Sequence, residues 1–217
     1  MCFSATASFT AAGVTGVIGV IALSRMSRPR EFMLAAMPVM FALQQSSEGL
    51  LWLNLPLAPE GPVATGLTLV FLLLAEVLWP LYVPSMMLLA EPDERRRRLM
   101  LPWFVAGVGV AGYLLWGIFA GPHEARILSG HIVYVTEHPF PFAVGLAYLA
   151  ATCLPLLLST YRAVLILGVI VLTGCVAAYT FYWDSFVSVW CFFGAAASAV
   201  ILFHFEQARR HRLQMGA

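Results

Sequence analysis

Seven long apolar stretches alternate with short polar segments along the sequence. A membrane-spanning helix needs about twenty mostly apolar residues, because it crosses about 30 Å of hydrocarbon at about 1.5 Å per residue. Each stretch is long enough to form one such helix. The predicted spans are residues 8–25, 32–54, 63–90, 99–119, 141–160, 162–183 and 186–206. The pattern therefore predicts an all-α, polytopic membrane protein in which residues 1–217 form a single seven-helix transmembrane domain.

The composition agrees with a membrane environment. Of the 217 residues, 61% are hydrophobic and 11% are charged, whereas roughly one quarter of the residues of a soluble protein are charged. The formal net charge of +1 gives no reason to expect nucleic acid, which requires clustered cations on an accessible face. We therefore expect the lipid bilayer to be the main partner.

The arginines predict an orientation for the bundle. All twelve cationic residues are arginines, and eleven of them follow the first, third, fifth or seventh predicted span. These eleven are Arg25, Arg28, Arg30, Arg95, Arg96, Arg97, Arg98, Arg162, Arg209, Arg210 and Arg212, and Arg126 lies alone on the opposite side. Because positively charged loops stay in the cytoplasm, we predict an outside N-terminus and a cytoplasmic C-terminus.

Small residues at helical spacing predict where helices pack closely, because lipid provides little hydrophobic drive between helices and small side chains permit close approach. Two such stripes occur, in the first and the seventh predicted spans. They consist of Gly13, Gly16 and Gly19, and of Ser188, Cys191, Ala195 and Ser198 or Ala199. We expect both helices to be packed inside the bundle.

The longest connection, residues 121–140, is predicted to form an outer loop. It is too long for a simple turn, and residues 132–136 are of strand-forming types. Gly130 and Pro139 could bound a short extended piece or a partial lid. This loop is the richest extramembrane segment in polar side chains.

The second predicted span contains a polar face. A carboxylate within a bilayer costs about 2.5–3.5 kcal/mol on insertion scales, so it needs a partner, a water-filled cavity or a proton. Glu48 is such a carboxylate, and Gln44, Glu48 and Trp52 follow one another at four-residue steps on one helix face. Gln45 flanks that face. These four residues are candidates for ligand binding.

The third predicted span contains a second buried carboxylate, Glu76. It lies four residues before Pro80, whose missing N–H can free a backbone carbonyl and bend the helix so that it lines a cavity. Two interpretations of Glu48 and Glu76 remain open. Each carboxyl could tie neighbouring helices together by hydrogen bonds, or it could accept a proton or a cation in an outward-facing pocket.

Three residues predicted to lie at the outer side could bind a metal. His131 and His138 would share a face in a helix and lie on opposite faces in a strand, and Cys2 could add a thiol. Zinc or copper would suit such ligands, but the spacing matches no specific zinc motif. Ordinary loop histidines and a packed cysteine are the alternative, and a disulfide between Cys2 and Cys191 is a further one.

Four segments carry a resemblance to a known family. They are MCFSATASF at the start, QQSSEGLLW in the second predicted span, GHIVY in the outer loop and SVWCFF in the seventh predicted span. With these, nearly the whole chain resembles an uncharacterised family of bacterial multi-pass membrane proteins, known as a domain of unknown function. The resemblance implies a polytopic fold in the bacterial inner membrane and supplies no activity or catalytic residue.

Three functions therefore remain open at the level of sequence. The favoured one is a transporter or sensor that binds a small molecule or ion through Gln44, Gln45, Glu48, Trp52 and Glu76. The second is a membrane-embedded, metal-dependent hydrolase, for which His131, His138 and Cys2 or Glu48 would have to converge on one metal. The third is an accessory subunit of a larger membrane complex, and a homo-oligomer is compatible with all three.

Overall fold

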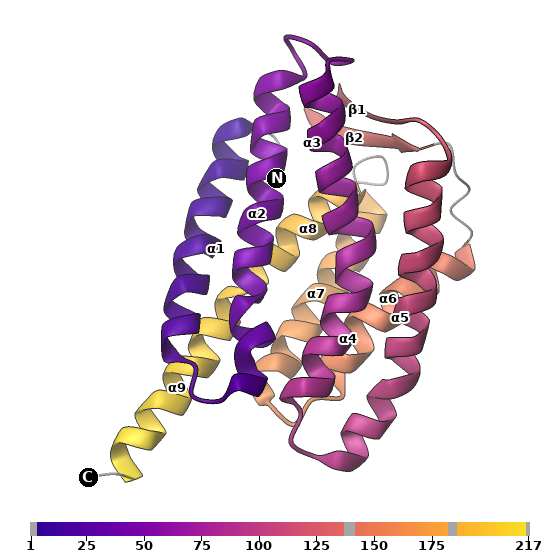
Figure 1. The fold of residues 1–217 in the computed structure, drawn as a ribbon. Helices are drawn as coiled ribbons and strands as arrows, with labels where there is room; N and C mark the ends of the chain where they lie inside the picture. Colours follow the sequence, from indigo (N-terminus) through magenta and orange to yellow (C-terminus); the bar gives the residue numbers. More distant parts are fainter. Residues whose placement is uncertain (1–3, 137–141, 182–185, 216–217) are drawn as a thin grey trace.

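The computed structural model is a bundle of helices that run side by side, with a small β-hairpin at one end (Figure 1). It describes residues 4–136, 142–181 and 186–215. The helices are α1 (Ala5–Arg25), α2 (Phe32–Asn54), α3 (Pro62–Leu72), α4 (Trp79–Ala90), α5 (Glu94–Ala120), α6 (Phe142–Leu157), α7 (Arg162–Phe181), α8 (Phe186–Ala197) and α9 (Ala199–Met215). A 3-10 turn, η1 (Pro29–Glu31), precedes α2, and a π-helical segment, η2 (Leu73–Leu78), joins α3 to α4. Helix thus occupies every range predicted as a span.

Five stretches are long and apolar enough to cross a membrane. They are Ala5–Arg25, Pro62–Ala90, Glu94–Ala120, Arg162–Phe181 and Val189–Arg210. α6 is apolar but shorter, with 16 residues. α2 has 23 residues and includes the polar segment from Gln44 to Glu48. Large apolar side chains such as Val17 and Val105 are exposed on the outer helix faces, as expected for faces that contact lipid.

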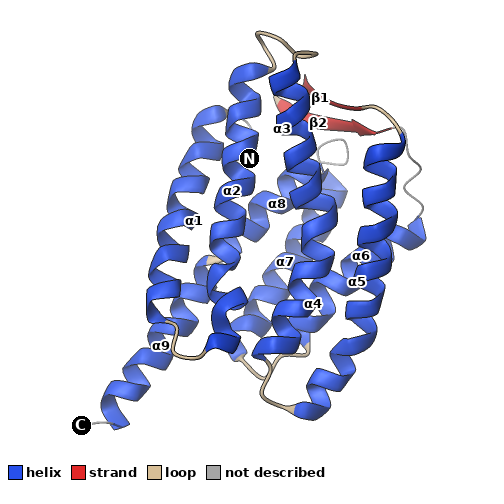
Figure 2. Cartoon of the chain, in the orientation of Figure 1, coloured by secondary structure: helices blue, strands red, loops and turns tan. Residues whose placement is uncertain are grey.

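The two ends of the bundle differ in chemistry. One end, here the hairpin end, has the link between α2 and α3 together with the β-hairpin (Figure 2). The other, the arginine end, has the α1–α2, α4–α5 and α6–α7 links and the C-terminus (Figure 1). Arg28 and Arg30 lie in the first of these links, and Arg95–Arg98 lie at the start of α5. The charge pattern of the sequence therefore coincides with one end of the folded bundle.

The hairpin consists of β1 (His123–Leu128) and β2 (His131–Thr136), which pair antiparallel. Ser129 and Gly130 join them with φ values of 48° and 77°, and two positive φ values are the mark of a tight type I′ turn. The extended segment predicted at residues 132–136 is β2, and β1 was not predicted. Ile132 is buried, and Tyr134 stacks on Phe71 of α3 with ring centroids 4.2 Å apart.

The small-residue prediction for the first span is correct at Gly19 and wrong at Gly13. A Cβ built on Gly19 would lie 2.4 Å from Cγ2 of Val39 in α2, so the two helices touch closely there. Gly16 makes an ordinary contact with Ala42, and Gly13 faces open space. The buried stripe of α1 runs through Ser8, Ala12, Thr15, Gly19 and Ala22, which places Gly13 beside the stripe and not on it.

Two side chains join the links of the arginine end. Glu91, at the end of α4, is buried and accepts hydrogen bonds from the backbone N–H of Thr160 at 2.8 Å, from the Thr160 hydroxyl and from the N–H of Asp93 at 3.1 Å. Arg96 donates from Nη1 to the carbonyls of Leu158 and Ser159 at 3.0 and 3.1 Å. The α4–α5 link is thereby fastened to the α6–α7 link.

Candidate functional site

The polar stretch of α2 is turned into the bundle. Gln44, Gln45 and Glu48 are fully buried, with 0% of each residue exposed. The side chain of Gln44 is held by Trp79 of α4, whose indole Nε1–H donates to Gln44 Oε1 at 2.7 Å. Phe41 stacks on the Trp79 ring with centroids 4.1 Å apart. The face predicted from four-residue spacing is therefore an inner face, packed against α4.

Glu76 lies in the π-helical segment that precedes α4. The prediction that Pro80 disturbs this helix agrees with η2 ending at Leu78, two residues before the proline. A π-segment widens a helix locally and is frequent at functional sites. Its carbonyls are open to other partners here, since the Tyr148 hydroxyl of α6 donates to the carbonyl of Ala75. Tyr148 thus ties α6 to the turn that carries Glu76.

Cys191 of α8 lies near these groups. Gln44 is a hydrogen-bond partner of its thiol, Glu48 and Glu76 lie within electrostatic range of it, and Cys191 and Glu76 both lie within range of Tyr148. We call Gln44, Glu48, Glu76 and Cys191 the polar cluster. Sequence reasoning placed Cys191 in a packing stripe and did not propose it as a site residue. Its position in that stripe was a signal that it faces the interior.

Several polar atoms around this cluster have no hydrogen-bond partner among the described residues, although they are shielded from solvent. They are Gln45 Oε1 and Nε2, Trp52 Nε1 and Glu76 Oε2. Buried polar atoms are nearly always paired, with protein or with ordered water. Donors and acceptors both occur in this set, so a partner that satisfies it must accept as well as donate hydrogen bonds.

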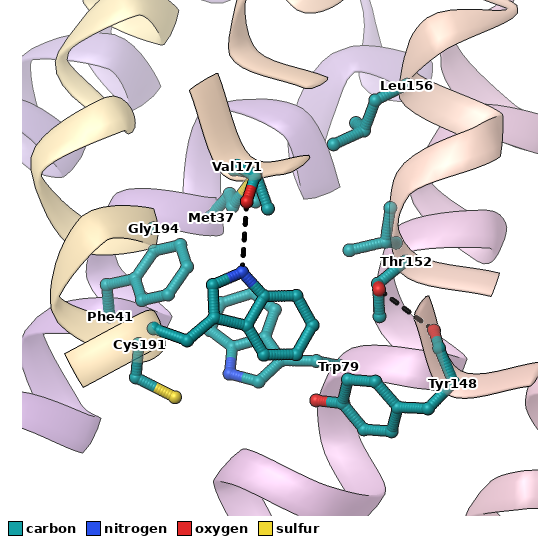
Figure 3. A pocket seen from close by; sticks show the side chains of 11 residues that line it. Met37, Phe41, Trp79, Tyr148, Thr152, Leu156, Val171, Cys191 and Gly194 are labelled. Carbon is teal, nitrogen blue, oxygen red and sulfur yellow. Dashed lines mark hydrogen bonds between the residues drawn. The ribbon is translucent and has the colours of Figure 1, made fainter. Parts of the chain in front are cut away.

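A cavity of about 40 Å³ lies next to the polar cluster, with Cys191 on its wall. Helices α2, α4, α6, α7 and α8 all contribute to its lining, and four of the lining side chains are the aromatic rings of Phe41, Trp79, Tyr148 and Trp190. Figure 3 shows Cys191 and Tyr148 on opposite sides of the Trp79 ring in this view. A buried water needs about 10–15 Å³ of such a cavity and two to four polar partners. The volume therefore equals that of a few waters, but the lining of the cavity is mostly apolar.

The hairpin covers the polar cluster from the hairpin end. Ala125 and Ile132 of the hairpin form one apolar cluster with Leu51, Phe71 and Cys191, and Trp52 packs against it. An apolar layer therefore separates the polar cluster from that end of the bundle. The polar cluster is therefore covered at the hairpin end, and the outward-facing pocket remains a prediction.

The described residues do not assemble the predicted metal site. Cys2 and His138 lie outside them, and in residues 4–136, 142–181 and 186–215 no group of three His, Cys, Asp or Glu side chains could hold a metal ion. His131 belongs to strand β2, so the helical alternative is wrong at this residue. Partial burial lowers the pKa of its imidazole. Cys191 is a free, buried thiol, as are Cys153 and Cys175.

Comparison with known proteins identifies the family and nothing more specific. The chain belongs to a family of unknown function (DUF6629), whose model matches residues 1–216. This confirms the family resemblance drawn from the sequence. Neither the curated proteins nor the solved structures include a significant match.

Proposed function

We propose that this member of a family of unknown function is a seven-span inner-membrane protein that binds a small hydrated cation at the polar cluster, as a transporter or sensor. The observation that carries the proposal is the set of shielded, unpaired polar atoms at or near the polar cluster, namely those of Gln45, Trp52 and Glu76. Carboxylates inside a bilayer mark ion pathways and ligand sites more often than they serve packing.

The chemistry of the cluster favours a cation that keeps some of its water. The carboxylates of Glu48 and Glu76 and the amide oxygen of Gln45 are ligands of the type that hard cations prefer. The amide N–H groups of Gln44 and the indole N–H of Trp52 cannot contact a cation, but they can donate to its waters. The neighbouring aromatic faces of Trp79 and Tyr148 add attraction for positive charge.

Access to such a site would come from the hairpin end. The apolar layer formed by Ile132, Ala125 and their neighbours covers the cluster, and sequestering a bound ion from bulk water is the usual role of such covers. The hairpin would then move aside to admit the ion. The arginines of the opposite end would repel a cation, so entry from the hairpin end is also favoured electrostatically.

Cation binding should be visible as a gain in thermal stability of the purified protein. We would compare Na⁺, K⁺ and NH₄⁺ with the bulky N-methylglucamine cation at constant ionic strength. A ligand present at a hundred times its Kd stabilises the folded state by about 2.7 kcal/mol. Glu76→Gln removes one charge from the cluster and should abolish the ion-specific gain, and Trp52→Phe, which removes an N–H donor, should weaken it.

The matched control for this measurement is Glu60→Gln, because Glu60 is exposed in the α2–α3 link. It carries the same charge change and should leave the ion dependence as it is. Equal stability in all four cations would contradict the proposal. So would a Glu76→Gln protein whose response to the ions matches that of the unchanged chain.

The proposed orientation, with the N-terminus outside and the C-terminus in the cytoplasm, rests on the arginine end. A reporter that is active in the periplasm should be silent when fused after Ala217 and active when inserted at Gly130 in the hairpin turn. A reporter that is active in the cytoplasm should give the reverse result. A periplasmic C-terminus would overturn the proposed topology, because it requires either an even number of spans or the opposite orientation.

A further inference from the structure

A second pocket lies at the arginine end, between the last turn of α1 and α9. It is a shallow hollow, largely open to the outside, and it is formed by Ser24, Arg25, Met26 and Arg209. α9 passes the lower end of α1 and continues beyond it toward the C-terminus (Figure 1). The pocket is thus built by two helices that are far apart in the sequence, and it lies at the level at which the arginines begin.

The charges around this pocket leave an excess of positive charge. Glu206 lies between two guanidinium groups, with Arg25 Nη1 3.5 Å from its Oε2 and Arg210 Nε 3.5 Å from its Oε1. Both distances are long compared with the 2.7–2.9 Å of a strong charged hydrogen bond. In the part of the chain that the structure describes, no ion pair joins Arg209 to a carboxylate. Among the ion pairs of the described residues, Arg25 and Arg210 share the single carboxylate of Glu206.

The nearby carboxylate of Glu31 does not reverse this excess, because Arg28 and Arg30 of the same α1–α2 link outnumber it. Its Oε2 accepts from the N–H and hydroxyl of Ser27 and from the N–H of Arg28, at 3.3 to 3.4 Å. Arg28 and Arg30 add further positive charge to the same link. Guanidinium groups bind phosphate oxygens well, since their planar N–H donors match the spacing of two oxygens.

The pocket is continuous with a lipid-facing surface. On α1, Val17, Val20 and Ser24 follow at three- and four-residue intervals and share one face. Val17 and Val20 are 60% and 65% exposed, so this apolar stripe leads directly to the pocket at Ser24. A phosphate held at the pocket can therefore carry acyl chains that lie along the stripe, whereas a soluble phosphate would leave the stripe unused.

From these observations we infer that the pocket of Ser24, Arg25 and Arg209 binds the phosphate group of an anionic membrane lipid. Basic pockets between transmembrane helices on the cytoplasmic side are suited to such headgroups. This site lies at the opposite end of the bundle from the polar cluster. The inference is therefore independent of the cation proposal, and either one can fail without the other.

The test uses the full chain, purified in a neutral maltoside detergent, with phosphatidylglycerol as the probe and phosphatidylcholine as the neutral lipid. Bound lipid is counted by native mass spectrometry, and the melting temperature is followed over a lipid titration. Phosphatidylglycerol should bind and stabilise more than phosphatidylcholine. Arg209→Gln should weaken the apparent affinity for phosphatidylglycerol about fivefold, in line with the contribution of one arginine near an anionic surface.

The control variant is Arg97→Gln, because Arg97 is also exposed at the arginine end and lies outside the pocket. It should change the affinity less than about twofold, since it removes the same charge from outside the site. Equal losses in the two variants would mean diffuse surface attraction and would overturn the site. Glycerol 3-phosphate has the phosphate without acyl chains. If it raised the melting temperature at the same concentrations, the pocket would be assigned to a soluble phosphate and the lipid inference would be overturned.

Discussion

Gly107→Ala should destabilise the folded protein by about 3 kcal/mol, because the added methyl group would clash with backbone atoms, which cannot rotate away as a side chain can. A Cβ built on Gly107 of α5 would lie 2.0 Å from the carbonyl oxygen of Pro80 and 3.0 Å from its carbonyl carbon. These are atoms of the α4 backbone, so α5 would have to move away from α4. Overpacking that displaces two helices is among the most costly single substitutions.

The sequence of α4 explains why its backbone comes so close. Pro84 lies inside the helix and has no N–H, so the carbonyl of Pro80, four residues earlier, lacks its usual helical donor. That carbonyl is turned toward Gly107, where the absent side chain lets the two helices touch. Lipid provides little hydrophobic drive between helices, so helices associate through close van der Waals packing. Small residues at such crossings make that packing possible.

Two further glycines of α5 provide a matched control for this substitution. Gly109 and Gly112 have open space around a built Cβ. Replacing either with alanine should be neutral or should stabilise α5 by about 0.5–1 kcal/mol, because alanine loses less backbone entropy in a helix. Melting temperatures in detergent would separate the two classes. A Gly107→Ala protein as stable as Gly109→Ala would contradict the close contact with Pro80.

The helices of this fold could be predicted from sequence because each depends on a local property, an apolar run of sufficient length. Some elements differ from this prediction, for reasons that an apolar run does not show. The segment 63–90 is apolar apart from Glu76 and three threonine or serine side chains, yet η2 interrupts it at Leu73–Leu78. The seventh predicted span divides into α8 and α9. Strand β1 contains three charged or polar side chains, so its strand character comes from pairing with β2 and not from its own pattern.

The sequence allowed only one part of the candidate site to be grouped, namely the residues that lie on the single helix α2. Gln44, Glu48 and Trp52 could be grouped because four-residue spacing in α2 places them on one face. Cys191 and Tyr148 reach the same place from α8 and α6, more than ninety residues away along the chain. A single sequence does not show that residues so far apart along the chain lie close together in the fold. The hydrogen bond from Trp79 to Gln44 is another long-range contact of this kind.

The role of Glu91 is also hidden in the sequence, because its neighbours in EPDERRRR are mostly charged and give no sign that this one carboxylate is buried. Its carboxylate is buried and joins two links that are about seventy residues apart in the sequence, through the N–H and hydroxyl of Thr160. Glu91→Ala should destabilise the protein by about 3 kcal/mol. The substitution leaves the N–H groups of Thr160 and Asp93 without their acceptor, and a lost hydrogen bond to a charged group costs about 1.5–3 kcal/mol.

The matched variant is Glu94→Ala, three residues further along the same link. Glu94 pairs with Arg98 at 2.7 Å, but both side chains are more than 60% exposed, and exposed pairs contribute only about 0–1 kcal/mol. Limited proteolysis gives a local readout beside the melting temperature. Loss of the Glu91 contacts should free the α4–α5 link and speed tryptic cleavage after Arg95–Arg98 relative to Glu94→Ala. Cleavage at equal rates in both variants would mean that Arg96, through the carbonyls of Leu158 and Ser159, is sufficient to hold the two links together.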